Sequence, residues 1–330
     1  MKHRSRFIAG LTTVPMLVST LMLALVFSSQ AVNAQGRFMH LSGERASPAF
    51  EGWWPNEDGS FKLFYGYMNS NWREEFDIDV GPNNYFNVTE AAGLDDLALE
   101  AYDFSIADRG QPTHFYPRRN AFLFTIDVPA DFGTDELVWT LITKGHTARA
   151  YGSLIPDYRI DPQVISTEVG GSFGSLDDRL RTNIPPELRL EGESFRTVRV
   201  GQPLSLAVHA NDPDNLPERR EGIRAGADQI YRPPASIVVM SGPGLRFSWT
   251  IYRGPAKYTT FEPTQFKTYM DSRAYANSPW SPPYTIPEVP PENRWTADVT
   301  FDQPGEYVLR GIASDGSMFS YQNLNVTVIR

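Results

Sequence analysis

The chain has 330 residues, with 30 Lys and Arg against 39 Asp and Glu and no Cys. The lack of Cys excludes disulfide frameworks, thiolate-ligated metals and thiol nucleophiles. A hydrophobic fraction of 41% beside a charged fraction of 21% is typical of a folded protein, and the length suits about two domains.

Residues 1–34 predict an export signal. Basic residues near the N-terminus precede an apolar stretch from Phe7 to Phe27, and Val32-Asn-Ala34 has the small-residue pattern of a cleavage site. Pro15 shortens the strongly apolar core, which favours cleavage after Ala34. We therefore expect a periplasmic or secreted protein with no later membrane span, and an uncleaved N-terminal anchor is the alternative.

The charge balance limits the partners. Loss of residues 1–34 removes three basic and no acidic side chains, so 27 basic and 39 acidic residues remain, a net charge of −12. Nucleic acid and anionic lipid both select clustered Lys and Arg, and this balance excludes them as expected partners. A glycan or an extracytoplasmic protein remains as the expected partner. Export without Cys favours a bacterial source, and nothing indicates the oligomeric state.

Residues 35–160 alternate with the period of a β-strand. Phe61, Leu63, Tyr65 and Tyr67 share one face of a predicted strand, and similar runs follow at Phe122–Val128 and Leu137–Leu141. The turn residues of Pro55–Gly59 predict a hairpin between the first strand and Trp53–Trp54. The pattern favours an aromatic-rich antiparallel β-sandwich.

Residues 161–184 are predicted to be a linker, because Gly170–Ser175 and the polar residues after it have little to bury. Residues 185–330 then predict a second antiparallel sandwich of the immunoglobulin type, with insertions at about 211–235 and 262–294. Its seven expected strands are Arg196–Val200, Leu204–Ala210, Ser236–Met240, Leu245–Tyr252, Trp295–Phe301, Glu306–Ala313 and Asn323–Ile329. The chain is therefore expected to be all-β, with two sandwich domains.

Three apolar residues are expected at the centre of this second sandwich. Leu206, Trp249 and Leu309 take the places of the disulfide and tryptophan of antibody domains. Tyr307, at the start of the sixth expected strand, is predicted to form a tyrosine corner.

Two segments carry a family resemblance. Val200-Gly-Gln-Pro-Leu-Ser-Leu-Ala-Val-His-Ala-Asn-Asp-Pro-Asp214 resembles the opening of bacterial polycystic-kidney-disease (PKD) and related cadherin-like repeats, and Phe301–Gly316 resembles their closing strands. The resemblance covers roughly 190–330 and implies a spacer or binding module on an exported protein. Trp249-Thr-Ile-Tyr252 replaces the usual Trp-Asp-Phe-Gly-Asp-Gly segment, so the resemblance is to the superfamily. The N-terminal part resembles only uncharacterised exported bacterial proteins.

The resemblance implies a metal site as one interpretation of three carboxylates. Asp212, Asp214 and Asp315 are expected in loops at the ends of the sandwich, where cadherin-like relatives bind calcium through such Asp pairs. The alternative is that these are turn residues, since Asp stabilises turns through local hydrogen bonds. No other cofactor is expected.

Candidate catalytic groups are few. The serine-hydrolase elbow, the phosphate-binding loops and the H-E-x-x-H motif are all missing from the sequence. Glu75, Asp77 and Asp79 alternate along one predicted strand face, so a glycosidase or lyase could use one of them with Asp95 or Asp96. A solvated outer face explains the same alternation without any catalysis, and we favour that interpretation.

Aromatic residues supply the candidate ligand-binding site. Aromatic side chains crowd the segment from residue 53 to residue 86, and one exposed face would make a glycan-binding platform, whereas core packing on both faces is the alternative. The proline-rich segment 262–294 is expected to be a loop that packs on the N-terminal domain or meets a partner. The candidate ligand-binding residues are Trp53, Trp54, Trp72, Tyr85, Trp280 and Tyr284.

These observations predict an exported, non-catalytic binding or structural module. The alternative is a carbohydrate-active enzyme, a glycoside hydrolase or lyase that uses the N-terminal carboxylates. The two differ in their site, because a binding platform needs an exposed flat aromatic face and an enzyme needs a cleft with facing carboxylates.

Overall fold

A computed structural model describes residues 40–71, 73–90, 108–169, 177–216, 244–265 and 288–330. Residues Ser42–Arg330 form one compact unit. Within the described ranges, no helix is long and apolar enough to cross a membrane. The predicted signal segment and the expected strand Ser236–Met240 lie outside these ranges. So do five of the candidate site residues, namely Trp72, Asp95, Asp96, Trp280 and Tyr284.

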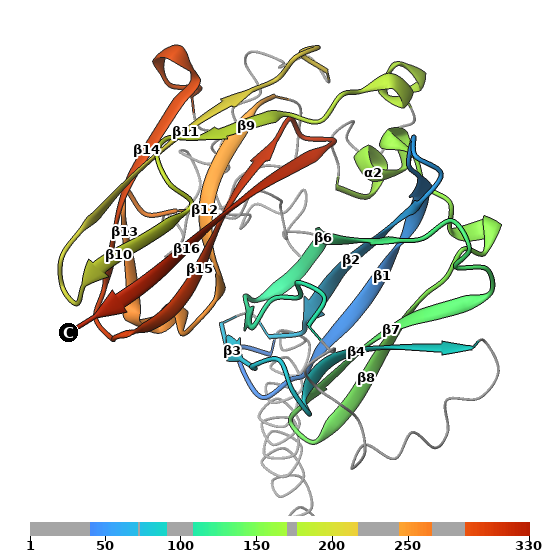
Figure 1. The fold of residues 1–330 in the computed structure, drawn as a ribbon, viewed down its shortest axis with the longest axis horizontal. Helices are drawn as coiled ribbons and strands as arrows, with labels where there is room; N and C mark the ends of the chain where they lie inside the picture. Colours follow the sequence, from blue (N-terminus) through green and yellow to red (C-terminus); the bar gives the residue numbers. More distant parts are fainter. Residues whose placement is uncertain (1–39, 72, 91–107, 170–176, 217–243, 266–287) are drawn as a thin grey trace, which may run out of the picture. The chain divides into compact units, whose positions relative to one another are not determined.

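The N-terminal half forms two three-stranded antiparallel sheets (Figure 1). The order of the first sheet is β1 (Ala46–Pro55), β2 (Phe61–Asn69) and β6 (Arg118–Val128). The order of the second is β4 (Asn84–Glu90), β7 (Asp135–Thr143) and β8 (His146–Gly152). Two short strands, β3 (Phe76–Asp77) and β5 (His114–Phe115), form a separate two-stranded sheet. The predicted hairpin is confirmed, because Trp53 pairs with Leu63 and Trp54 with Lys62.

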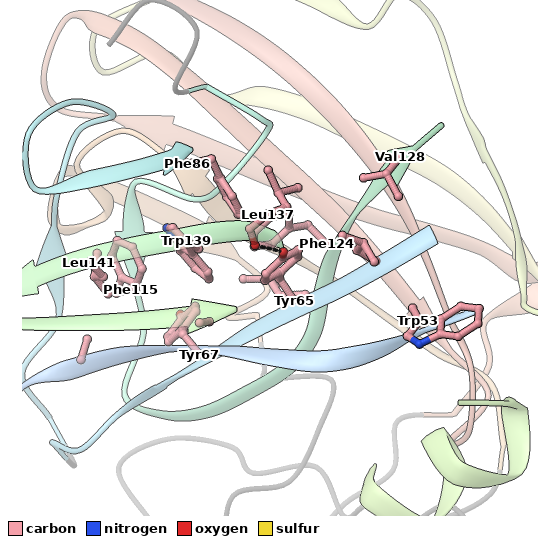
Figure 2. Packing of buried hydrophobic residues seen from close by; sticks show 14 of the residues in the cluster. Trp53, Tyr65, Tyr67, Phe86, Phe115, Phe124, Val128, Leu137, Trp139 and Leu141 are labelled. Atoms are coloured by element: carbon pink, nitrogen blue, oxygen red, sulfur yellow. Dashed lines mark hydrogen bonds between the residues drawn. The ribbon is translucent and has the colours of Figure 1, made fainter. Parts of the chain in front are cut away.

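The two N-terminal sheets share an aromatic core. Tyr65 is fully buried, and its hydroxyl donates to the carbonyl oxygen of Leu137 at 2.6 Å. Its ring stacks on Phe124 with centroids 5.7 Å apart, and Phe86 stacks on Trp139 at 5.7 Å. Figure 2 shows these rings gathered between the strands. The alternation of the sequence therefore gave the core face correctly, because strand side chains point alternately to opposite faces.

The C-terminal half is an immunoglobulin-like sandwich of two four-stranded sheets. The order of one sheet is β13 (Thr259–Glu262), β14 (Arg294–Phe301), β11 (Leu204–Asn211) and β9 (Glu187–Leu190). The order of the other is β10 (Phe195–Arg199), β16 (Phe319–Ile329), β15 (Gly305–Ser314) and β12 (Arg246–Arg253). Strands β10 and β16 are parallel, and the other pairs are antiparallel. The predicted all-β fold with an immunoglobulin-like second sandwich is confirmed.

The predicted centre of the sandwich is also confirmed. Leu206, Trp249 and Leu309 are all buried in one apolar cluster between the sheets. The Tyr307 hydroxyl donates to the carbonyl oxygen of Gln303 at 3.0 Å, which is the bond of a tyrosine corner. Strands β9 and β13 were not predicted, because each is a four-residue strand whose outward side chains are polar.

The segment predicted as a linker contains local structure. Helix α2 (Pro162–Val169) begins after Asp161, whose carboxylate accepts from the Val164 backbone N–H at 2.9 Å and so caps the helix. A 3₁₀ turn, η5 (Asp178–Thr182), follows it. Ile165 of α2 is buried in a small cluster with Phe64 of β2 and Met318, which follows β15. This segment therefore contributes an apolar side chain to the packing on β2.

Candidate functional site

A cluster of charged side chains lies where the N-terminal strands meet β12 of the sandwich. His114 of β5 is 2% exposed. Its Nδ1 atom lies 2.7 Å from Asp77 Oδ1, and its Nε2 atom lies 3.2 Å from Glu75 Oε2. Both carboxylate side chains remain about half exposed, at 45% for Asp77 and 41% for Glu75. The register of β3 against β5 places Asp77 directly opposite His114.

The carboxylates determine the charge of the imidazole. Burial by itself lowers the pKa of His114, but hydrogen bonds and attraction from Asp77 and Glu75 outweigh burial, so the pKa lies above the usual value of 6.5. A histidine with a carboxylate at each ring nitrogen is best satisfied as an imidazolium, which donates from both. The two ring nitrogens point in different directions, so the three side chains do not converge on one centre. In the described ranges, no group of three or more His, Asp or Glu side chains is arranged to hold a metal.

The segment around His114 joins the N-terminal strands to the sandwich. We name residues 108–116 the junction segment. On the N-terminal side, the Ile78 N–H donates to the Thr113 carbonyl at 2.7 Å. On the other side, the Thr113 N–H donates to the carbonyl of Tyr252 in β12 at 3.1 Å. The Tyr116 hydroxyl accepts from the Ile251 N–H at 2.9 Å. The junction segment thus satisfies the outer edge of β12 at Ile251 and Tyr252, and this part of the edge is not open for pairing with another strand.

An ion pair holds the start of the junction segment. The guanidinium of Arg253 in β12 forms two hydrogen bonds with the Asp108 carboxylate, at 2.7 and 2.8 Å, and its Nε donates to the Gln111 carbonyl at 2.9 Å. The Arg253 hydrogen bond holds the pKa of Asp108 below its usual value despite partial burial. Two parallel bonds fix orientation as well as distance, so this pair sets the register of the segment along β12.

A second arginine lies between the sandwich and the first N-terminal sheet. Arg310 of β15 is 7% exposed, and its guanidinium carbon lies 3.4 Å from the centre of the Tyr252 ring. Its Nη1 donates to the carbonyl oxygen of Leu123 in β6 at 2.8 Å, and its Nε donates to Asn323 Oδ1 at 2.8 Å. The Tyr321 hydroxyl donates to the Phe122 carbonyl beside it. Arg310 therefore binds the backbone of the N-terminal half directly.

The described aromatic candidates do not form an exposed platform. Trp53 is 9% exposed, and its indole N–H donates to the Ile155 carbonyl at 2.8 Å. Tyr85 is 4% exposed. Trp54 is half-buried, and its ring packs edge-on against Phe64 with centroids 4.4 Å apart. Trp53 and Tyr85 therefore present no open ring face, and Trp54 alone among these three keeps a partly exposed surface.

The three metal candidates accept hydrogen bonds from neighbouring loops. Burial raises the pKa of Asp315 to about 7, although its Oδ1 accepts from the backbone N–H groups of Ser317 and Met318 at 2.6 and 2.7 Å. Burial and a hydrogen bond with Asp214 raise the pKa of Asp212 to about 6. Asp214 accepts from the Ile184 backbone N–H at 2.9 Å.

Calcium binds six to eight oxygen atoms. Oxygens that already accept N–H groups fit the interpretation of these Asp residues as turn residues better than a calcium shell. Calcium at Asp212, Asp214 and Asp315 stays a prediction.

The residues at the junction were not predicted from the sequence. His114 has no partner close to it in the sequence, because Asp77 and Glu75 lie 37 or more residues earlier. The burial of Arg310 could have been predicted from the residues around it in the sequence. The residues on both of its sides along β15, Val308 with Leu309 and Ile312 with Ala313, are apolar on both strand faces. A strand that is apolar on both faces is covered on both faces.

Comparisons with known proteins place the chain in no family. No protein-family model matches it, and no curated protein sequence does. Among solved structures, a chimeric titin Z1Z2 carrying a decorin peptide matches at 10% identity and a TM-score of 0.21, covering 88% of this chain and 100% of that one. The Yersinia pseudotuberculosis adhesin InvE matches at 10% identity and a TM-score of 0.21, and the match covers 87% of this chain and 56% of the InvE chain. The D00–D0 domain of intimin matches at 7% identity and a TM-score of 0.22, and the match covers 87% of this chain and 100% of the intimin chain. The chain thus spans little more than half of the adhesin chain. The fold assignment rests on the sheet order described above.

Proposed function

We propose that the chain is an exported, non-catalytic binding or structural module, in which the N-terminal sheets and the immunoglobulin-like sandwich act as one rigid body. Its expected partner is a glycan or an extracytoplasmic protein. One observation carries the proposal: the buried charged groups at the junction all bind the chain itself. Arg310 binds the backbone of β6, and His114 binds two carboxylates of its own half. The Nε and Nη1 atoms of Arg310 have already made their hydrogen bonds, so this group is fixed in place and is not offered to a reactant.

Rigid connection suits a module that presents a surface. Relative motion between two sandwiches is the default when few contacts join them. Here a bidentate ion pair, a stacked arginine and three hydrogen bonds to β12 oppose that motion. A surface that is fixed before binding loses less conformational entropy when a partner binds it.

The proposal is tested with the chain from residue 35 onward, which contains the whole compact unit Ser42–Arg330. The protein is applied to a glycan array and to insoluble polysaccharides, with and without calcium, and the same polysaccharides are assayed for released reducing ends. Binding without turnover supports a binding module, and neither binding nor turnover supports a structural one. Turnover of any polysaccharide contradicts the proposal.

A carbohydrate-active enzyme is the second candidate, and one observation favours it. Glu75, which directly precedes β3, and Asp77 of β3 both contact His114, and each keeps close to half of its side chain in solvent. Paired carboxylates of this kind serve as acid and base in glycoside hydrolysis. If turnover is found, Glu75→Gln and Asp77→Asn should each abolish it, whereas Asp79→Asn, on the same exposed face, should not.

A further inference from the structure

His114 lies in a segment that touches both halves of the described chain at adjacent residues. Thr113, its neighbour, bonds to Ile78 of the N-terminal half and to Tyr252 of β12. The hydroxyl of Tyr116, two residues after His114, accepts a hydrogen bond from the Ile251 N–H of the same strand. A shift of β5 along or away from β3 therefore reaches the edge of the sandwich without any intervening loop.

The contacts of the imidazole depend on its two protons. With both nitrogens protonated, the ring donates toward Asp77 at 2.7 Å and is attracted to Glu75 at 3.2 Å. The neutral ring has a single N–H, so one carboxylate then faces a nitrogen lone pair. Because both carboxylate side chains are about half exposed, the unpaired one can turn to water, whereas the ring, at 2% exposure, stays buried. Deprotonation thus removes one of the two side-chain contacts of His114 with the segment that contains β3, while the backbone bond from Ile78 to Thr113 remains.

Among the residues that the structure describes, the other titratable groups near the cluster do not take over the charge. The Tyr116 ring packs edge-on against the His114 ring, with the ring centroids 4.4 Å apart. Burial raises the pKa of Tyr116 well above its usual value. Tyr307 of β15 feels the charge of Asp77, and burial also raises its pKa. Both tyrosines are therefore neutral across the range in which histidine titrates. On the β12 side, the charged pair is Arg253 with Asp108, and it is already closed on itself.

We propose that Glu75, His114 and Asp77 form a proton-operated fastener, which holds the junction segment against β3 when the imidazole is charged and loosens its contacts with β12 when the imidazole is neutral. The fastener regulates how firmly the two halves are joined. It is independent of the identity of the ligand, and it acts on the same connection between the halves on which the proposed function rests.

The direction of the pH dependence follows from the contacts. The pKa of His114 is raised in the folded chain, so the stabilisation is fully present below the unfolded value of 6.5. It is lost as the pH rises through the folded pKa, which lies above 6.5. The junction is therefore tighter in acid and looser in mild alkali.

The test is NMR on the isotope-labelled chain from residue 35 onward. The side-chain signals of His114 are titrated, and the exchange protection of the Ile251 amide is followed between about pH 6 and about pH 9. We expect His114 to titrate above 6.5. The Ile251 protection, corrected for intrinsic exchange, should fall by about threefold or more, the change expected for the loss of one net hydrogen bond. In His114→Gln the protection should no longer change with pH.

Three controls distinguish the fastener from a general pH effect. His209→Gln removes a histidine on β11 that is paired with Glu191, and it should leave the Ile251 profile unchanged. Glu75→Gln and Asp77→Asn change half-exposed carboxylates and should fold even if His114→Gln does not, and each should lower the pKa of His114. Titration of His114 below 6.5, or the same Ile251 profile in His114→Gln as in the unmodified chain, would overturn the proposal.

Discussion

Replacing Gly152 by Ala tests how tightly the N-terminal aromatic core is packed. Gly152 is a buried residue at the end of β8, paired with Leu137 of β7. A Cβ atom there would overlap the hydroxyl oxygen of Tyr65, and it would lie 2.9 Å from Tyr65 Cζ and 3.1 Å from the Leu137 carbonyl oxygen. Position 152 therefore requires glycine, because the Tyr65 side chain occupies the space that a Cβ atom would fill.

The expected cost follows from what must move. Tyr65 is fully buried and stacks on Phe124, so its ring has no free direction. Overpacking a well-packed core costs about 1–3 kcal/mol, and displacing the hydroxyl from Leu137 O leaves buried polar groups unsatisfied at about 1–3 kcal/mol more. We expect Gly152→Ala to lower the free energy of unfolding by about 2–6 kcal/mol.

A double-mutant cycle isolates the clash. Tyr65→Phe alone removes the donor to Leu137 O and should cost about 1–2 kcal/mol. In that background Gly152→Ala no longer meets the hydroxyl oxygen, so its cost should be at least about 1 kcal/mol smaller than in the unmodified chain. The free energies are measured by urea denaturation, followed by tryptophan fluorescence and near-ultraviolet circular dichroism.

Thr147→Ala is the control, because Thr147 is exposed on the same strand. It should change the free energy of unfolding by about 0.5 kcal/mol or less. The packing argument is refuted if Gly152→Ala is as mild as this control, or if the two core substitutions are additive.

Three further substitutions test the buried polar contacts. Arg310→Ala removes the donor to the Leu123 carbonyl oxygen and a guanidinium stacked on the Tyr252 ring, so it should lower the free energy of unfolding in urea by about 3 kcal/mol. Arg310→Lys cannot stack as a plane and should lower it by about 1–2 kcal/mol. Small and equal losses in the two variants would contradict this. Arg119→Ala leaves the Glu51 carboxylate buried without its bidentate partner and should cost about 3 kcal/mol at neutral pH. Burial already raises the pKa of Glu51, so thermal melts should show a smaller loss in acid, and a loss that grows in acid would disprove the assignment. Tyr307→Phe should cost about 1 kcal/mol by the loss of its corner bond, and no measurable change in the urea midpoint would show that bond to be neutral.

Strand positions and cores were predictable because they depend on local alternation. Leu206, Trp249 and Leu309 each lie on the apolar face of an alternating strand, and the structure buries all three. The short edge strands β9 and β13 were missed because four residues with polar outward side chains give too short a pattern. Pairing with β11 and β14 decides their conformation.

The junction depends on contacts that no local pattern contains. His114 meets Asp77 only because β3 and β5 pair, and Tyr116 reaches Ile251 across 135 positions of sequence. The exposure of Trp53 was equally undetermined, since alternation separates two faces without saying which is covered. Its indole N–H meets the Ile155 carbonyl, 102 residues away, and that contact fixes it inside.

Differential scanning calorimetry of the chain from residue 35 onward tests most directly whether the N-terminal sheets and the sandwich form one rigid module. The account predicts a single transition with a van't Hoff enthalpy about equal to the calorimetric enthalpy, and a lower midpoint but still one transition in Arg310→Lys. Two resolved transitions in the unmodified chain would contradict it, because the halves would then unfold independently in spite of Arg310, Arg253 and the junction segment.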